Sequence, residues 1–210
     1  MIFRYGLLDM LMLVPLFILS ITLHEAAHAY AAFACGDRTA AREGRLTLNP
    51  AAHLDPLGAL MVLLVGFGWA KPVPVDERNL RHPAWQIPLV AAAGPLANFL
   101  LATVSVLGLQ LGTLFAAAFV IEPLLVMASL NLMLMLFNLV PLPPLDGAGI
   151  IRALLPYSLQ REYDKLLPYG PVLLIVLVFV PGISDVFLSL IHSLSRQIMN
   201  FLMTLFSFLL

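Results

Sequence analysis

The sequence is poor in charge and contains a single cysteine, and both shortages restrict the class of protein. Charged residues make up 11% of the chain, whereas a typical soluble domain contains about 25%. Cys35 alone cannot form an intrachain bridge, which excludes a disulfide-stabilised framework. The net charge is −1 and there is no basic tract, so the charge pattern gives no reason to expect nucleic acid as a partner.

Apolar residues are what the chain has in excess. They make up 61% of its 210 residues and give a mean hydropathy of +0.97. A chain of this composition would aggregate in water, which predicts an all-α polytopic protein of the lipid bilayer. The apolar N-terminal stretch continues without a cleavage site into the following helix, so we interpret it as part of the mature chain rather than as a signal peptide.

The apolar segments predict a helical bundle of about five to six membrane segments. The expected helices cover residues 7–34, 87–121, 123–140 and 166–182, followed by an amphipathic helix over 184–210. We group residues 1–165 as an intramembrane core and residues 166–210 as a C-terminal membrane helix with the amphipathic helix. The sequence leaves open whether 184–210 spans the membrane, lies on its surface or pairs with a second copy in a homo-oligomer.

The basic residues predict how the segments are oriented. The stretch 56–70 has about 15 residues, fewer than the roughly 20 that a span requires. If it enters the membrane and returns on the same side, every Lys and Arg except Arg4 and Arg196 shares one face. The positive-inside rule makes that face cytoplasmic. We therefore predict a re-entrant 56–70, an external N-terminus, and cytoplasmic segments at residues 35–55, 71–86 and 146–165.

A metal-binding pattern lies inside the first predicted helix. His24 and His28 in "HEAAH" are four residues apart, so both imidazoles can reach one metal from the same helix face. Glu25 stands beside them as a candidate general base. Three such groups in an apolar helix are costly and are functional by default. An interhelical hydrogen-bond cluster is the structural alternative.

A third ligand is expected, because a catalytic zinc site uses three protein ligands and one open position. Asp146 is the outstanding candidate, since it follows an apolar helix and the proline-rich "PLPP" (141–144) that ends it. With 56–70 re-entrant, the helices 7–34 and 123–140 run in the same direction. Asp146 then lies at the same side of the membrane as His24 and His28. The alternative is a loop aspartate at the membrane surface.

These motifs together resemble the site-2 protease family of intramembrane zinc metalloproteases, in its short bacterial and archaeal branch. The likeness rests on "HEAAH" (24–28), "AGPLAN" (93–98) and "NLVPLPPLDG" (138–147), with "NPAAHLDPLG" (49–58) and "GWAKPVPV" (68–75) in addition. It implies one Zn²⁺ per chain, bound by His24, His28 and Asp146, with Glu25 as the catalytic base. It also implies transmembrane protein substrates, cleaved in or near their membrane segments.

Three further residues are candidates for the site. Asn98 is one amide in an apolar helix start; the resemblance implies that it contacts substrate or the reaction oxyanion, and helix–helix packing is the alternative. Asn138 can touch substrate or hold the proline-broken segment by hydrogen bonds. His53 can add a ligand to the metal, gate the cavity, or bond locally to Asp55. His82 is interpreted as a solvated loop residue, and His192 as part of the polar side of the amphipathic helix.

The stretch "WAKPVPVDERNL" (69–80) predicts a small β element near the active site. Its residues alternate in polarity, and its prolines confine a strand to a sheet edge. Such an edge can hold an extended substrate by strand addition. A plain loop is the alternative.

The sequence thus favours a membrane-embedded zinc metalloendopeptidase with its active site toward the cytoplasm. A metal or ion transporter is one alternative, but it requires ionisable residues across the whole membrane depth, whereas here they cluster at one end. A non-catalytic metal-binding scaffold is another, although such a site has no need of Glu25. Zinc content and cleavage of transmembrane peptides distinguish the three.

Overall fold

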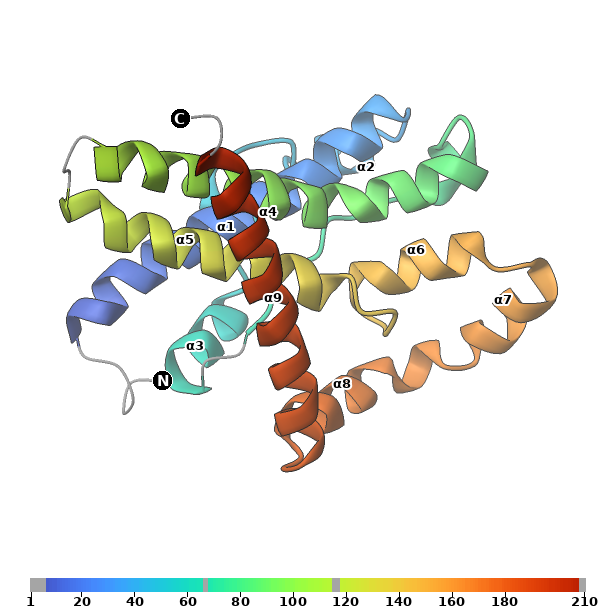
Figure 1. Ribbon diagram of the computed structural model, residues 1–210. Helices are drawn as coiled ribbons and strands as arrows, with labels where there is room; N and C mark the ends of the chain where they lie inside the picture. Colours follow the sequence, from blue (N-terminus) through green and yellow to red (C-terminus); the bar gives the residue numbers. More distant parts are fainter. Residues whose placement is uncertain (1–6, 66–67, 115–117, 208–210) are drawn as a thin grey trace.

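The computed structural model describes residues 7–65, 68–114 and 118–207, and within them the protein is built from helices and loops without a ladder strand (Figure 1). The predicted all-α class is therefore confirmed. The helices are α1 (Leu7–Ala34), α2 (Thr39–Arg42), α3 (Pro56–Val65), α4 (Pro83–Leu114), α5 (Ala118–Asn138), α6 (Asp146–Leu154), α7 (Tyr157–Asp164), α8 (Gly170–Phe179) and α9 (Ile183–Ser207), with 3-10 turns η1 (Pro50–Ala52), η2 (Glu77–Asn79) and η3 (Leu167–Tyr169).

Three described helices are long and apolar enough to cross a membrane, which supports a multi-pass membrane protein. They are Met10–Ala34, Pro83–Gly112 and Phe119–Asn138, and the bent pair Tyr157–Phe179 with Ile183–Ser207 adds at most a fourth. The prediction of five to six membrane segments is not confirmed. The predicted fifth segment contains α8, whose ten residues extend only about 15 Å, half of a hydrocarbon core.

Helices α1, α4 and α5 form the centre of the bundle. Figure 1 shows α1 and α5 running in the same direction and α4 running in the opposite direction. Small buried residues lie where these helices approach: Ala29, Ala102 and Ala128 have no exposed surface. Small side chains let helix backbones come close, which replaces the hydrophobic driving force that lipid removes. The parallel course of α1 and α5 is the one that the re-entrant topology requires.

The predicted boundary between the second and third long helices is wrong. We expected one helix over 87–121 and a break at Glu122-Pro123, whereas α4 ends at Leu114 and Pro123 lies inside α5. Residues 115–117 of the predicted helix lie outside the described part of the chain. Pro88 and Pro95 likewise lie inside α4. Membrane helices tolerate proline because neighbouring helices and small backbone adjustments compensate the lost hydrogen bond.

The chain on either side of α3 is held together at one point, and the re-entrant course of 56–70 stays a prediction. Leu54 and Ala70 form an antiparallel bridge across its base, and a Cβ on Gly58 would lie 2.1 Å from the Trp69 carbonyl oxygen. Glycine is therefore required where the outgoing and returning chains touch. Residues 66–67 of the predicted segment lie outside the described part.

The small β element predicted at 69–80 is not confirmed. The structure shows one isolated bridge at Ala70, then an irregular stretch and the turn η2. Two of the residues that follow the bridge, Pro72 and Pro74, lack the N–H that a ladder needs.

The loop after α1 is attached to this returning chain by a buried aspartate. The Asp37 side chain has no exposed surface and accepts hydrogen bonds from the Thr39 N–H and hydroxyl, the Asp76 N–H and the Asn79 amide. Burial raises the pKa of this carboxyl, but the four hydrogen bonds outweigh burial and hold the pKa below its ordinary value. Asp37 therefore fixes 76–79 against the end of α1.

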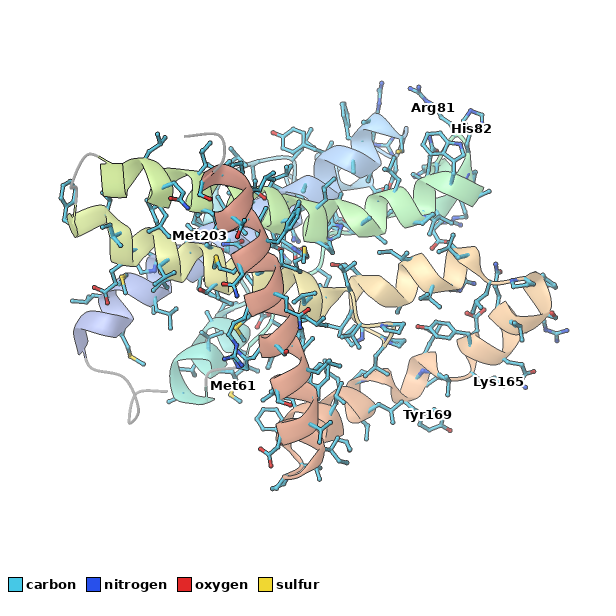
Figure 2. All side chains as sticks on the ribbon, viewed as in Figure 1. Met61, Arg81, His82, Lys165, Tyr169 and Met203 are labelled. Atoms are coloured by element: carbon cyan, nitrogen blue, oxygen red, sulfur yellow. The ribbon has the colours of Figure 1, made fainter. Side chains whose placement is uncertain are left out.

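The C-terminal helices cross the bundle rather than extend it. In Figure 1, α9 passes over α5 and α4, and Ile198, Met199 and Leu202 pack on Ala102 and Ala128. The polar side of α9 faces away from these contacts, since Arg196 and Asn200 are exposed. Figure 2 shows Arg81, His82 and Lys165 toward one end of the bundle and Met203 toward the other.

Candidate metal centre

Two histidines of α1 converge at the middle of the bundle. His24 and His28 are both buried, and their Nε2 atoms lie 3.1 Å apart. The i, i+4 spacing places both rings on the helix face that packs on α4. The sequence predicted that the two imidazoles lie together, and the structure brings them together.

Asp146 reaches the same point from the start of α6. Its Oδ2 lies 3.1 Å from the His24 Nε2, and its Oδ1 lies 3.3 Å from the His28 Nε2. The proline-rich segment brings it there by turning back tightly. The turn is so tight that a Cβ on Gly147 would lie 2.2 Å from the Leu139 carbonyl oxygen. Two histidines of α1 and an aspartate more than 100 residues further along the chain thus form one group.

Hydrogen bonds behind the rings determine which nitrogen faces the group. The His28 Nδ1 lies 2.8 Å from the Val90 carbonyl oxygen, and the His24 Nδ1 lies 2.5 Å from the Asn98 Oδ1. A carbonyl oxygen only accepts, so each Nδ1 carries the proton and each Nε2 keeps its lone pair. This is the tautomer and orientation that a metal-binding histidine needs.

The geometry of the three groups fits a zinc ion. Two imidazole lone pairs and a carboxylate converge without a proton between them, and the buried Asp146 Oδ2 has no hydrogen-bond partner among the described residues. Acceptors this close repel one another unless a cation lies between them. Ligand atoms about 2.0–2.1 Å from a tetrahedral zinc would lie roughly 3.3 Å apart, close to the three separations observed.

Gly94 of α4 lies directly against the two rings. A Cβ at this position would lie 2.2 Å from the His28 Nε2 and 2.5 Å from the His24 Nε2. No side chain therefore fits between α4 and the metal-binding atoms. The sequence "AGPLAN" contains this glycine, and the close approach explains why a glycine stands there.

A large cavity opens beside the group. Its volume is about 1150 Å³, and His24, Glu25, His28 and Asp146 all line it. Glu25 is half-buried there. Along α1 the lining continues away from the group in a helical stripe of apolar side chains: Ile21, Phe17, Val14, Leu13 and Met10. From Met10 to His28 this stripe is roughly 27 Å long, close to the thickness of a hydrocarbon core.

The other candidate residues lie at different places around the cavity. Asn98 is buried behind His24, and its Nδ2 donates to Asn131 Oδ1 at 2.7 Å. Asn138 is half-buried, lines the cavity and donates to the Leu134 carbonyl oxygen. His53 has no exposed surface and lies outside the His24, His28 and Asp146 group.

Local contacts define the surroundings of the remaining histidines. The His53 Nε2 lies 2.9 Å from the Thr47 carbonyl oxygen, and its Nδ1 has no partner in the described chain. His82 is exposed and stacks on Trp85. His192 is also exposed, and it lies on the cavity wall.

Sequence reasoning missed two buried polar residues next to the site. Asn131 of α5 and Ser20 of α1 have no exposed surface, and the Asn131 Nδ2 donates to the Ser20 Oγ at 2.8 Å. A polar side chain inside a membrane helix is a functional candidate by default. The same reasoning that selected Asn98 would have selected Asn131.

Comparison with known proteins agrees with the chemistry of these residues. The model of peptidase family M50 matches residues 109–178, which include Asp146. A protein of Bacillus subtilis (strain 168) named "Putative zinc metalloprotease YwhC" is 44% identical over 184 residues, 84% of each chain. "Putative zinc metalloprotease Rip2" of Mycolicibacterium smegmatis is 30% identical over 181 residues, 83% of this chain and 69% of that protein.

No solved structure matches the chain. The strength of the Bacillus match, over most of both sequences, establishes the family. The chain belongs to the M50 peptidases, the site-2 protease family of zinc metalloproteases.

Proposed function

We propose that the protein is an intramembrane zinc endopeptidase whose single zinc is held by His24, His28 and Asp146. The observation that carries the proposal is the convergence of two imidazole lone pairs and one half-buried carboxylate, each 3.1–3.3 Å from the next. Three protein ligands leave one position open, which is the arrangement of catalytic rather than structural zinc.

Glu25 performs the proton transfers in this proposal. Zinc, when bound, polarises the scissile carbonyl and makes water acidic enough to attack it near neutral pH. The Glu25 carboxylate, on the cavity wall beside the ligands, accepts the proton of the attacking water. It then gives a proton to the leaving amine, so that the group ends the cycle as it began.

The neighbouring residues hold this arrangement. The resemblance implies an oxyanion role for Asn98, but both ends of its amide are engaged by His24 and Asn131, which supports a positioning role instead. Asn138 lines the cavity, which supports contact with substrate. His53 is held by the Thr47 carbonyl oxygen, which favours a structural role in the loop before α3 over a ligand role.

Transmembrane segments of other membrane proteins are the proposed substrates. The cavity is mainly apolar and follows α1 for about the length of a membrane span. A helix hides its carbonyls in its own hydrogen bonds, so the substrate must unwind near the ligands. Trp69, Ala70, Pro72, Val73 and Val75 of the returning chain line the cavity. That stretch is a candidate guide for the unwound peptide.

The ligands lie toward the ends of α1 and α5 at which the basic loops gather, which supports access of water from the cytoplasmic side. His24 is about 17 residues, or roughly 25 Å, from the start of α1. The proposed orientation keeps 35–55, 71–86 and 146–165 in the cytoplasm and the N-terminus outside.

Peptide cleavage with purified protein tests the proposal. Wild type and Glu25→Gln are assayed for zinc content and incubated with a panel of transmembrane peptides in detergent or bilayer mimics. We expect one zinc per chain in both proteins and cleavage by wild type alone. Zinc-loaded wild type that cleaves nothing, or cleaves no faster than Glu25→Gln, would contradict the protease mechanism and favour a metal-binding scaffold.

A further inference from the structure

A continuous chain of buried hydrogen bonds leads from the backbone of α1 and α5 to His24. The Asn131 Nδ2 donates to the Met127 carbonyl oxygen at 2.9 Å and to the Ser20 Oγ at 2.8 Å. Asn131 Oδ1 accepts from the Asn98 Nδ2 at 2.7 Å, and the Asn98 Oδ1 lies against the His24 Nδ1. Ser20, Asn98 and Asn131 are each 99–100% buried, so water cannot replace these partners.

Two backbone carbonyl oxygens, those of Met127 and Leu16, determine which atom donates in each of these hydrogen bonds. The Met127 carbonyl oxygen can only accept, so the NH₂ end of Asn131 must face it. The Ser20 hydroxyl donates to the Leu16 carbonyl oxygen, which leaves the Ser20 oxygen as an acceptor for Asn131. Both N–H groups of Asn131 are then used, and its oxygen faces Asn98.

The orientation of Asn98 follows in the same way. Its NH₂ end faces the Asn131 oxygen, so its own oxygen must face His24. An oxygen at this position accepts a proton from His24 Nδ1 and leaves the lone pair of Nε2 toward Asp146. If the Asn98 amide turned over, its N–H would face Nδ1, and the proton of His24 would move to Nε2. Such an imidazole cannot bind a metal through Nε2.

We propose that Asn131 is a positioning residue for the metal site, which acts with Ser20 to fix the amide orientation of Asn98 and thereby the tautomer of His24. The proposal rests on the proposed zinc site. It assigns to α5 a second contribution to zinc binding besides carrying the chain to Asp146. It also gives the three helices of the bundle a shared polar connection that is set by backbone carbonyls.

The test is zinc affinity, measured by competition with a chromophoric chelator in detergent, for wild type and a set of variants. Asn131→Leu keeps the size of the side chain but frees the Asn98 amide to turn, and we expect zinc affinity to fall about 10- to 100-fold, as for other residues that orient a ligand. Leu132→Ala is the matched control: Leu132 is fully buried on the same helix turn and its side chain carries no hydrogen-bonding group, so the zinc affinity of this variant should equal wild type.

A rescue variant separates orientation from packing. In Asn131→Leu/Asn98→Asp, a carboxylate offers His24 an acceptor whichever way it turns, so zinc affinity should return to within a few-fold of wild type. Asn98→Asp alone should bind zinc more weakly than the double variant, because it sets a carboxylate oxygen against Asn131 Oδ1. A packing defect predicts the reverse, since a second buried polar change would add to the first.

Two results would overturn the proposal: unchanged zinc affinity in Asn131→Leu, or a double variant that binds no better than Asn131→Leu. If Asn131→Leu does not fold, Ser20→Ala replaces it, with an expected loss of about 2- to 10-fold. Thr22→Val is then the control, because Thr22 is also buried on α1 but, among the described residues, its hydroxyl donates to the Ile18 carbonyl oxygen of its own helix. Wild type without zinc would instead contradict the proposed function itself.

Discussion

The two halves of α1 differ in what surrounds them. From Met10 to Leu19 all residues are described and none is buried. From Ser20 to Ala32 the buried residues are Ser20, Thr22, His24, Ala26, His28, Ala29 and Ala32. The first half is uniformly apolar, whereas the second holds every strongly polar side chain of the helix apart from Asp9.

The difference shows where a membrane helix can hold polar chemistry. In the second half, α4 supplies an acceptor to His24 and to His28, α5 supplies a donor to Ser20, and small residues let the backbones approach. In the first half only lipid and the apolar cavity are available, and a polar group there would remain unpaired. The metal site therefore lies where three helices meet, at one end of the cavity.

The largest effect on activity should come from adding a methyl group to α4 where it packs against the second half of α1. Gly94→Ala places a carbon within 2.2–2.6 Å of both imidazoles, and the rings cannot move without leaving Asn98 and Val90. We expect peptide cleavage to fall by about 100-fold or more, the cost of misplacing a catalytic group by about 1 Å.

Gly108→Ala is the matched control on the same helix. Its added carbon would approach only the end of the Leu124 side chain, at 3.3 Å. Cleavage should stay within a few-fold of wild type. Equal losses of cleavage in both variants would contradict a specific role for the contact between Gly94 and the two imidazoles.

A second contrast concerns stability rather than catalysis. Leu132 is fully buried between α4 and α9, whereas Leu11 on the first half of α1 is 64% exposed. Leu132→Ala should lower the free energy of unfolding by about 2–5 kcal/mol, because it leaves a cavity. Leu11→Ala should change it little, since lipid tails replace the lost contacts. Thermal unfolding in detergent measures both, and a larger loss at Leu11 would contradict the burial pattern.

A smaller loss of stability is expected at Asp37, which attaches the end of α1 to residues 76–79. Asp37→Asn turns an N–H toward the Asp76 N–H that now donates to Asp37, so the free energy of unfolding should fall by about 1–3 kcal/mol. The control Asp164→Asn weakens a half-exposed pair with Arg152 and should cost less. A greater loss at Asp164 would contradict the role of Asp37.

The smallest effect is the pH dependence of the stability that the Asp37 carboxylate contributes. The folded-state pKa of Asp37 lies below its ordinary value of 3.8, so the stability that it contributes is fully present above that value and is lost as pH falls through the folded pKa. The difference in melting temperature between wild type and Asp37→Asn should therefore be constant from pH 5 to 8 and shrink in stronger acid. A difference that shrinks between pH 5 and 8 would contradict the lowered pKa.

Much of the site follows from the sequence because short-range rules determine it. The i, i+4 spacing places His24 and His28 together, and counting membrane crossings selects Asp146 as the partner. The same counting depends on 56–70 returning, and the bridge between Leu54 and Ala70 has the form that a return requires.

The features that could not be predicted from the sequence depend on contacts between helices. Nothing local shows that Gly94 touches both rings or that Asn131 faces Asn98, because these contacts depend on how α4 and α5 pack on α1. The helix break predicted at Glu122-Pro123 was wrong for a related reason: Pro123 lies inside α5, and membrane helices tolerate a proline where neighbouring helices compensate the lost hydrogen bond. The β element at 69–80 was overestimated because alternation alone does not provide a partner strand.

The central claim is that Asp146 completes a zinc site with the two histidines of α1, and zinc content measures it directly. Purified wild type and Asp164→Ala, which removes an exposed-side carboxylate away from the site, should each carry one zinc per chain. Asp146→Ala should lose most of its zinc under the same chelator wash while remaining folded. Full zinc in Asp146→Ala, or none in wild type, would contradict the account.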